Sequence, residues 1–167
     1  MRPVVYLAGP INDATVQQAA NWREVWAERL ALLGYDYIDP FEAKSALRSK
    51  NYLGKNLDKV AIDSGLITSQ EVIQHSLDMT EKSDIVVLNF LDVKRFNIHT
   101  IGTSAELVFA TMYQDLKNKP RKYTIVLAND IYSSFFTLAD KILSSEEQLF
   151  EYLEQRLLSE HNTKQLQ

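Results

Sequence analysis

The chain has 167 residues, of which 46% are hydrophobic and 24% are charged, and its formal net charge is −4. This length is typical of one domain with its own buried core, and the composition is that of an ordinary globular protein. The acidic balance argues against nucleic acid as a partner, because phosphate contacts need a basic surface. Without cysteine the chain has no disulfide, thiol nucleophile or cysteine-ligated zinc.

No apolar run reaches the ~18 residues that a membrane-spanning helix needs. The first residues lead directly into an apolar strand pattern, so no signal peptide is predicted. We therefore expect a cytoplasmic protein. Residues 1–160 are expected to form a single domain, followed by a polar C-terminal tail over 161–167.

The first elements are a strand and a long helix. The apolar run from Pro3 to Ala8 predicts a short buried strand that Gly9-Pro10 ends. Asp13 is a candidate N-cap for a helix that runs to about residue 33, where Gly34 supplies a stop. Apolar residues at spacings of three and four form one stripe on this helix: Ala19, Trp22, Trp26, Leu30 and Leu33. We expect both tryptophans to lie in the core.

The middle of the chain is less regular. Residues 35–38 predict a second strand, closed by Asp39-Pro40. The basic stretch over 41–67 is either a substrate lid or a solvated surface excursion. Thr68 and Glu71 form a capping box that opens a helix, and residues 84–90 predict a central strand. Asp84 begins this strand, so we expect a structural role for it rather than a catalytic one.

The C-terminal third continues the alternation of strands and helices. A helix is expected from Thr103 to about Lys117, a fourth strand over 123–128 and a short fifth strand over 139–144. A capping box from Ser144 to Glu147 opens the last helix. Strands that alternate with helices predict a parallel sheet covered on both faces, with ligands bound beyond the carboxyl ends of the strands.

That edge of the sheet is rich in carboxylates and hydroxyls. The histidines show no metal-ligand spacing, and neither Gly-x-Gly-x-x-Gly nor a phosphate-binding lysine loop is present. Glu106 lies one turn into a helix at this edge, where a carboxylate can attack a sugar and form a covalent ester. The pattern Thr103-Ser104-Ala105-Glu106 also fits a plain capping box, and on local pattern alone this is the favoured interpretation.

Four motifs together favour a catalytic role for Glu106 over a capping role. They are Tyr6-Leu7-Ala8-Gly9-Pro10, Asp39-Pro40, Ser83-Asp84-Ile85-Val86-Val87-Leu88-Asn89 and Thr100-Ile101-Gly102-Thr103-Ser104-Ala105-Glu106-Leu107. In order and spacing, over about residues 3 to 130, the chain resembles the nucleoside 2-deoxyribosyltransferase family, which includes related nucleoside 5′-monophosphate N-glycosidases. The resemblance implies an α/β flavodoxin-like (Rossmann-like) three-layer sandwich, with a parallel sheet of about five strands in the order 2-1-3-4-5.

The resemblance also implies an activity and roles for residues. Glu106 would attack the anomeric carbon of a deoxyribose, Tyr6 would orient its carboxylate, and the released sugar would pass to another nucleobase. Further substrate contacts are expected at Ala8, Gly9, Pro10, Asp39, Phe41, Ser76, Asn89, Thr100, Gly102, Thr103 and Ser104. No metal or organic cofactor is implied. The expected partners are a nucleoside or nucleotide and a free nucleobase, within a homo-oligomer whose interface could involve apolar residues near 132–136.

Two positions depart from the family pattern. Ser76 stands where many members have an aspartate, and Asp78, about 200° further around a helix, cannot simply replace it. Thr100 stands where the typical transferases have another aspartate. A hydroxyl there resembles the relatives that hydrolyse nucleoside 5′-monophosphates. Thr100, Thr103 and Ser104 would then form an anion site at a helix start, or serve as ordinary loop and cap hydroxyls.

Three hypotheses remain. The first is a glycosyl-transfer enzyme, with hydrolysis of nucleoside monophosphates as its close alternative. The second is a non-catalytic nucleotide-binding or sensor domain on the same fold, because fold does not determine function. The third, a flavin-binding protein, is disfavoured because the first strand–helix turn, Gly9-Pro10-Ile11-Asn12, lacks a hydroxyl-rich phosphate loop.

Overall fold

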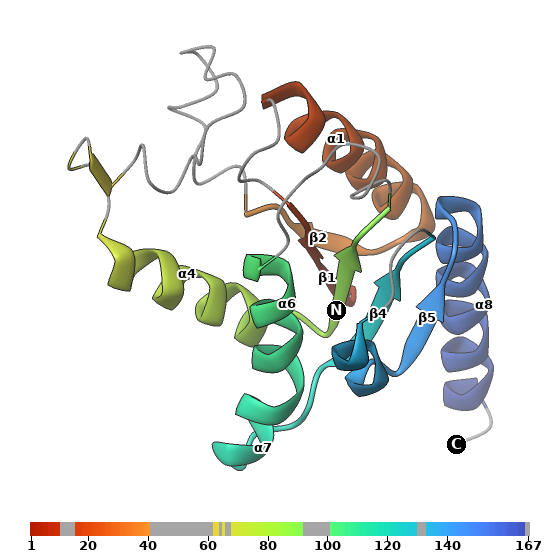
Figure 1. Cartoon of the computed structure of the whole chain (residues 1–167). Helices are drawn as coiled ribbons and strands as arrows, with labels where there is room; N and C mark the ends of the chain where they lie inside the picture. The colour runs from red at the N-terminus through yellow and green to blue at the C-terminus, as the bar shows by residue number, and fades with distance from the viewer. Residues whose placement is uncertain are drawn as a thin grey trace.

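The computed structural model describes residues 1–10, 16–40, 62–63, 65, 68–91, 101–129 and 133–165. Their backbone forms a five-stranded parallel sheet in the order β2-β1-β3-β4-β5, with helices on both sides (Figure 1). The predicted α/β flavodoxin-like architecture and its strand order are therefore confirmed.

The five strands are short. They are β1 (Val4–Ala8), β2 (Asp36–Ile38), β3 (Ile85–Asn89), β4 (Tyr123–Leu127) and β5 (Lys141–Leu143). The three central strands, β1, β3 and β4, are almost wholly buried, whereas β2 and β5 at the edges are mostly exposed. A parallel strand that is covered on both faces must be apolar on both, which explains the unbroken runs of Val, Ile and Leu in the sequence.

The described helices fill the connections between the strands. They are α1 (Val16–Leu33), α4 (Ser69–Lys82), α6 (Ile101–Val108), the π-helix η2 (Phe109–Tyr113), α7 (Gln114–Leu116), the 3-10 helix η3 (Ser134–Leu138) and α8 (Glu146–Gln165). The segment expected as one helix from Thr103 is thus a run of three helical pieces that begins at Ile101. Helix α8 continues to Gln165, so most of the expected polar tail has helical backbone.

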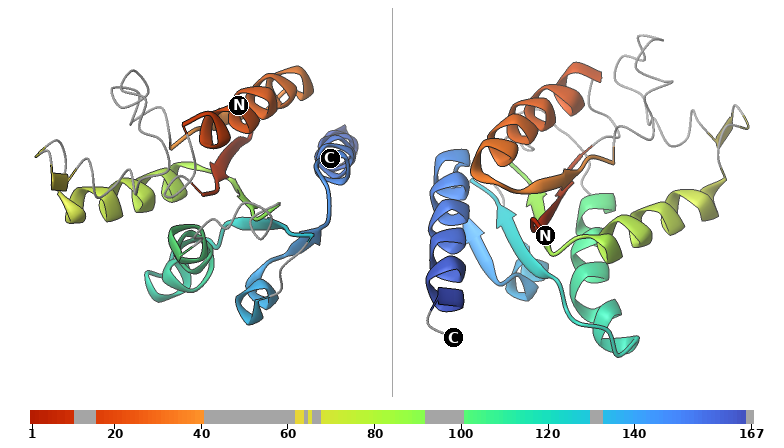
Figure 2. Two further views of the ribbon diagram at one scale, coloured as in Figure 1. Left: turned by 45° about the horizontal axis from the view of Figure 1, so that its top comes forward. Right: turned by 180° about the vertical axis from the view of Figure 1, so that it is seen from behind.

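Figure 2 shows the sheet and the helices on its two faces from two further sides. The sheet separates two apolar layers of side chains. On one face, Val5 and Leu7 of β1 pack with Trp26 and Leu30 of α1 and with Leu153 of α8. The other face carries a second cluster, formed by Tyr6, Ala8, Met79, Val86, Leu88, Phe90, Leu107, Ala110, Val126 and Phe136. Burying one large apolar side chain contributes about 1.5–3 kcal/mol, so these two layers supply the main driving force for folding.

At the edge where the strands begin, Asp84 has the expected structural role. Its carboxylate accepts a hydrogen bond of 2.8 Å from the backbone N–H of Val4, and its own N–H donates to the Val4 carbonyl at 2.8 Å. Its carbonyl accepts from the backbone N–H of Tyr123 at 3.2 Å. Asp84 therefore joins the start of β3 to the starts of both neighbouring strands, away from the edge where ligands are expected.

The helix ends follow the predicted signals, with one correction. Gly34 ends α1 with φ 96, a left-handed conformation that favours glycine. The capping box predicted from Ser144 to Glu147 is not formed, because α8 begins at Glu146 and Ser145 precedes it. Ser145 Oγ accepts from the Gln148 N–H at 3.3 Å, and the Gln148 side chain accepts from the Ser144 N–H at 2.9 Å. Ser145 thus caps the helix, and the reciprocal bond of a capping box is replaced by one to the residue before the cap.

The capping box of α4 is formed as predicted and provides a test of the fold. Thr68 Oγ1 accepts from the Glu71 N–H at 3.2 Å, and the Glu71 carboxylate accepts from the Thr68 N–H at 2.7 Å. We expect Thr68→Ala to lower the free energy of unfolding by about 1 kcal/mol, because one N–H of the first turn loses its acceptor. Urea denaturation measures this change. The control Gln70→Ala, at an exposed position of the same turn, should stay within about 0.5 kcal/mol of the unsubstituted protein.

Candidate functional site

The candidate site lies where β1, β2 and β3 end. Ala8, Ile38 and Asn89 are the last residues of these strands, and α6 begins at the same edge with Ile101. Segments that are far apart in the chain are thereby brought together, as expected for a parallel sheet. Figure 1 shows β1 and β3 between α1 and α6.

At the centre of this site, Tyr6 and Glu106 form a buried hydrogen bond. The Tyr6 hydroxyl donates to Glu106 Oε1 across 100 positions of sequence. Tyr6 is fully buried, and only 9% of Glu106 is exposed. A carboxylate this far from water needs strong donors, since an unsatisfied buried polar group costs about 1–3 kcal/mol or more. The Tyr6 phenol supplies one such donor.

The surroundings keep the Tyr6 phenol protonated. Burial is the largest cause that raises its pKa well above 10.0, followed by the negative charge of Glu106 and by the hydrogen bond to it. The positive charge of Arg23 and a hydrogen bond with the Ser76 side chain act in the opposite direction and lower the pKa. Tyr6 is therefore a hydrogen-bond donor throughout the neutral pH range, with Ser76 beside it.

The capping-box interpretation of Thr103 and Glu106 is wrong. Helix α6 begins at Ile101, so Thr103 is its third residue and not its N-cap. Thr103 is 3% exposed, and the Glu106 side chain reaches the sheet and binds Tyr6. The sequence pattern Thr-x-x-Glu is compatible with a capping box and also with a glutamate that binds the sheet. The hydrogen bond from Tyr6 of β1 shows that Glu106 binds the sheet.

A second polar cluster lies beside this pair and is centred on Arg23 of α1. The Arg23 side chain is fully buried, and its Nη2 donates to the Gly9 carbonyl at 2.8 Å. Its Nε lies 3.3 Å from Oδ1 of Asp39, of which 8% is exposed. Asp39 therefore pairs with a buried guanidinium at the end of β2, a partner that sequence reasoning did not provide.

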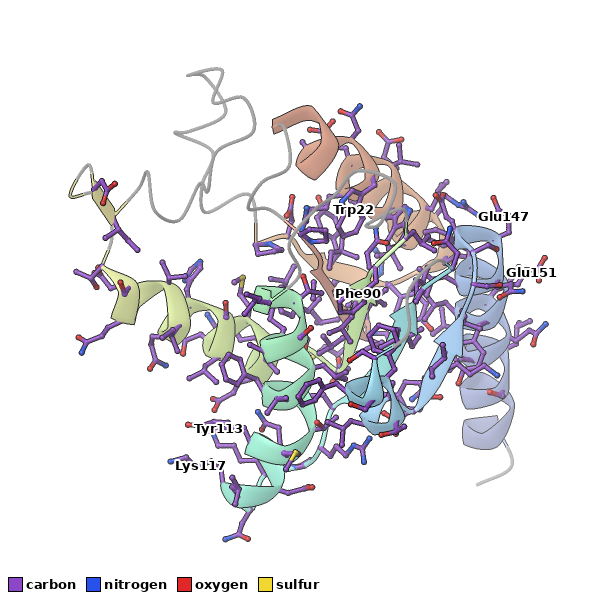
Figure 3. The ribbon with its side chains drawn as sticks, viewed as in Figure 1. Trp22, Phe90, Tyr113, Lys117, Glu147 and Glu151 are labelled. Carbon is purple, nitrogen blue, oxygen red and sulfur yellow. The ribbon has the colours of Figure 1, made fainter. Side chains whose placement is uncertain are left out.

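Gly9 is enclosed by the side chains of α1. A methyl group at Gly9 would lie 2.6 Å from Cζ2 of Trp22 and 3.4 Å from Nη2 of Arg23. The Arg23 guanidinium in turn stacks 4.2 Å from the centre of the Trp22 ring. Figure 3 shows Trp22 between α1 and the sheet. The close approach that requires glycine here is thus made by the Trp22 ring.

The remaining predicted site residues lie in different surroundings. Ala8 packs in the core, whereas Asn89 uses its side-chain oxygen to accept from the Leu91 N–H at 3.0 Å. Three residues lie in the first turn of α6: Gly102 is exposed, Thr103 is buried and Ser104 is partly buried. Pro10 is partly exposed at the end of its segment. Phe41 and Thr100 lie outside the described residues.

Asp78 takes no part in this cluster. Its carboxylate accepts a hydrogen bond of 2.7 Å from Gln74 on α4. Ser76 of the same helix is the residue that interacts with Tyr6. The hydroxyl of Ser76, and not the Asp78 carboxylate, therefore adjoins the Tyr6–Glu106 pair.

Arg23 is the residue that sequence reasoning missed. It lies four residues after Ala19 and three before Trp26, so it occupies the same stripe as the apolar residues of α1. A charge within an apolar stripe is a signal of a buried pair, because an unpaired buried charge is strongly unfavourable. The sequence therefore indicates that Arg23 is paired, but it does not indicate that the partner is Asp39.

Among the described residues, no group of three or more His, Cys, Asp or Glu side chains is placed to hold a metal ion. In the same part of the chain, no helix is both long and apolar enough to cross a membrane. At positions 133–136, where an oligomer interface was suggested, Phe135 is 51% exposed and Phe136 is buried.

Comparison with known proteins assigns the chain to no family. No protein-family model matches the chain, and no curated protein matches it. Among solved structures, the crystal structure of a signal receiver domain from Vibrio parahaemolyticus is similar, with 10% sequence identity and a TM-score of 0.45. The match covers 98% of each chain.

The packing of Gly9 against Trp22 can be tested by a double-mutant cycle. We expect Gly9→Ala to lower the free energy of unfolding by about 1–3 kcal/mol, because the new methyl group overlaps the indole ring. In a Trp22→Leu background, the same change should cost clearly less, since the smaller side chain leaves room. Gly102→Ala is the matched control: a methyl group at Gly102 would have no neighbour within 4 Å among the described residues, so no loss is expected. Equal costs in both backgrounds would contradict this packing.

Proposed function

We propose that the chain cleaves the N-glycosidic bond of deoxynucleosides, with Glu106 as the nucleophile, and transfers the deoxyribosyl group to another nucleobase. The observation that carries this proposal is the buried Tyr6–Glu106 hydrogen bond beside the carboxyl ends of the strands. The four sequence motifs that resemble the nucleoside 2-deoxyribosyltransferase family support it.

The proposed reaction has two displacements at the anomeric carbon. In the first, an oxygen of the Glu106 carboxylate forms a bond to C1′ while the bond from C1′ to the base nitrogen breaks. The electron pair of that bond stays on the base, which takes up a proton. In the second, a nitrogen of an incoming base attacks C1′, breaks the ester bond and loses its proton. The Glu106 carboxylate is then restored, and no oxidant or reductant is consumed.

Tyr6 serves this reaction by holding one carboxylate oxygen. Because its phenol is protonated at neutral pH, it donates to Oε1 and orients the Glu106 carboxylate for the attack. The fixed orientation removes part of the entropic cost of bringing the carboxylate to C1′. The phenol also stabilises the carboxylate as it departs in the second displacement.

Hydrolysis of nucleoside 5′-monophosphates is the second candidate function. Ser76 favours this function. Its hydroxyl lies beside Tyr6, at a position where many members of the nucleoside 2-deoxyribosyltransferase family have an aspartate. In this alternative, water attacks C1′ in the second displacement, and deoxyribose 5-phosphate is released with the free base. Thr100, where the typical transferases have an aspartate, also favours this alternative, and it lies outside the described residues.

The nucleophile is tested by Glu106→Gln. We expect this variant to lose roughly 10³-fold or more in kcat, because an amide oxygen does not form the glycosyl ester. The protein is incubated with each deoxynucleoside and each monophosphate, with and without a second base, and products are separated by chromatography. Free base alone indicates hydrolysis, and a new nucleoside indicates transfer.

The matched control is Glu151→Gln, at an exposed position of α8 far from the site (Figure 3). It should keep full activity. Activity in Glu106→Gln equal to that of the unsubstituted protein would refute the nucleophile assignment. If the unsubstituted protein binds nucleotides and turns none over, the sensor hypothesis replaces the enzyme.

The role of Tyr6 is tested by Tyr6→Phe. We expect kcat to fall about 10- to 100-fold, which corresponds to one hydrogen bond to a charged group. KM should change less, because the phenol contacts Glu106 and not the substrate. Tyr113→Phe, on η2 at the far end of the helical run (Figure 3), is the control that should leave both constants unchanged.

A further inference from the structure

The proposed reaction leaves one buried charge without a role. Arg23 is fully buried within α1, although arginine is almost never found so far from water unless it is paired. Its guanidinium makes three described contacts: the Gly9 carbonyl, the Asp39 carboxylate and the Trp22 ring. Keeping an ion pair in a protein interior is costly, and an apolar pair of similar size is often as stable. Stability alone is therefore a weak reason for this arrangement.

The contacts of Arg23 join the ends of two neighbouring strands. Gly9 is the first residue after β1, and Asp39 is the first residue after β2. Arg23 Nη2 lies 2.8 Å from the Gly9 oxygen, and Nε lies 3.3 Å from Asp39 Oδ1. The guanidinium thus joins the two strand ends through a hydrogen bond to one and an ion pair with the other.

We propose that Arg23 is a positioning residue for the Tyr6–Glu106 pair. Tyr6 lies three residues before Gly9 on β1, so the carbonyl that Arg23 holds belongs to the end of the strand that carries the phenol. The guanidinium fixes this end from the α1 side, while Glu106 meets Tyr6 on the α6 side. This inference rests on the proposed function for its effect on catalysis.

A separate observation places the charge of Arg23 within reach of the phenol. The Arg23 charge lowers the pKa of Tyr6, against the larger effects of burial and of Glu106. A substitution of Arg23 should therefore change the environment of the Tyr6 phenol in two ways, by moving the backbone at the end of β1 and by changing the electric field.

The test uses two variants of Arg23 and one matched control. Arg23→Met keeps the length and removes the charge, and Arg23→Lys keeps the charge and removes the fork. Arg29→Met is the control: Arg29 also lies on α1, pairs with Glu146 at 2.7 Å and stacks 3.7 Å from the Phe150 ring, but on the side of α8. The Arg29 side chain is 40% exposed, so this control reports the loss of a partly exposed ion pair from the same helix.

In the active enzyme, we expect Arg23→Met to lower kcat about 10- to 100-fold with a smaller change in KM, as for a misplaced catalytic group. Arg23→Lys should recover part of the loss, and Arg29→Met should leave kcat unchanged. A purely structural Arg23 would lower the melting temperature and leave kcat of the folded protein unchanged. That result would overturn the proposal.

A second readout does not depend on activity. Tyrosine labelled with ¹³C at Cζ gives one NMR signal per phenol, and Tyr6→Phe assigns the signal of Tyr6. We expect this signal to shift in Arg23→Met and to stay in place in Arg29→Met. If the unsubstituted protein turns over no nucleoside, the proposed function fails, and a shift in Arg23→Lys, which keeps the charge, still shows that the contacts of the guanidinium position Tyr6. An unmoved signal in folded Arg23→Met overturns the proposal, and Arg23→Lys carries the test if Arg23→Met does not fold.

Discussion

The burial of both faces of the sheet is the constraint on which the rest of this structure depends. β1 lies between two apolar layers, one on each face of the sheet. Any polar group on β1, or in contact with it, must therefore be paired inside the protein. Tyr6 meets Glu106 on one face, and Arg23 meets Gly9 and Asp39 near the end of the strand. The candidate site therefore has few polar side chains, and in the described part of the chain they bind one another or the backbone of the strand ends.

The same burial determines how these groups titrate. Removal from water raises the pKa of Tyr6, and the neighbouring Glu106 carboxylate raises it further. The phenol therefore keeps its proton and donates it in the hydrogen bond to Glu106. Arg23 and Asp39 form an ion pair close to the phenol, which limits the net charge that the interior must hold. The Glu106 carboxylate is thereby held by Tyr6 beside an otherwise apolar layer.

Sequence reasoning locates the elements more reliably than their ends. The runs of Val, Ile and Leu predict β1, β3 and β4 because strands buried on both faces admit little else. The starts of α6 and α8 lie one or two residues from their predicted positions, because several hydroxyl and acidic residues in each segment can serve as caps. At Glu106, the capping pattern and the contact with Tyr6 use the same residue type at the same position, and local pattern does not separate them.

The sequence by itself determined the α/β class, the parallel sheet and the edge at which Tyr6, Asp39 and Glu106 gather, because these follow from apolar periodicity and from the direction of parallel strands. The family resemblance implied the contact between Tyr6 and Glu106, and the structure contains that hydrogen bond. Only the tertiary structure placed Ser76 beside this pair and paired Asp39 with Arg23. Such pairings join residues from different elements, up to 100 positions apart, and the spacing within any one element carries no information about them.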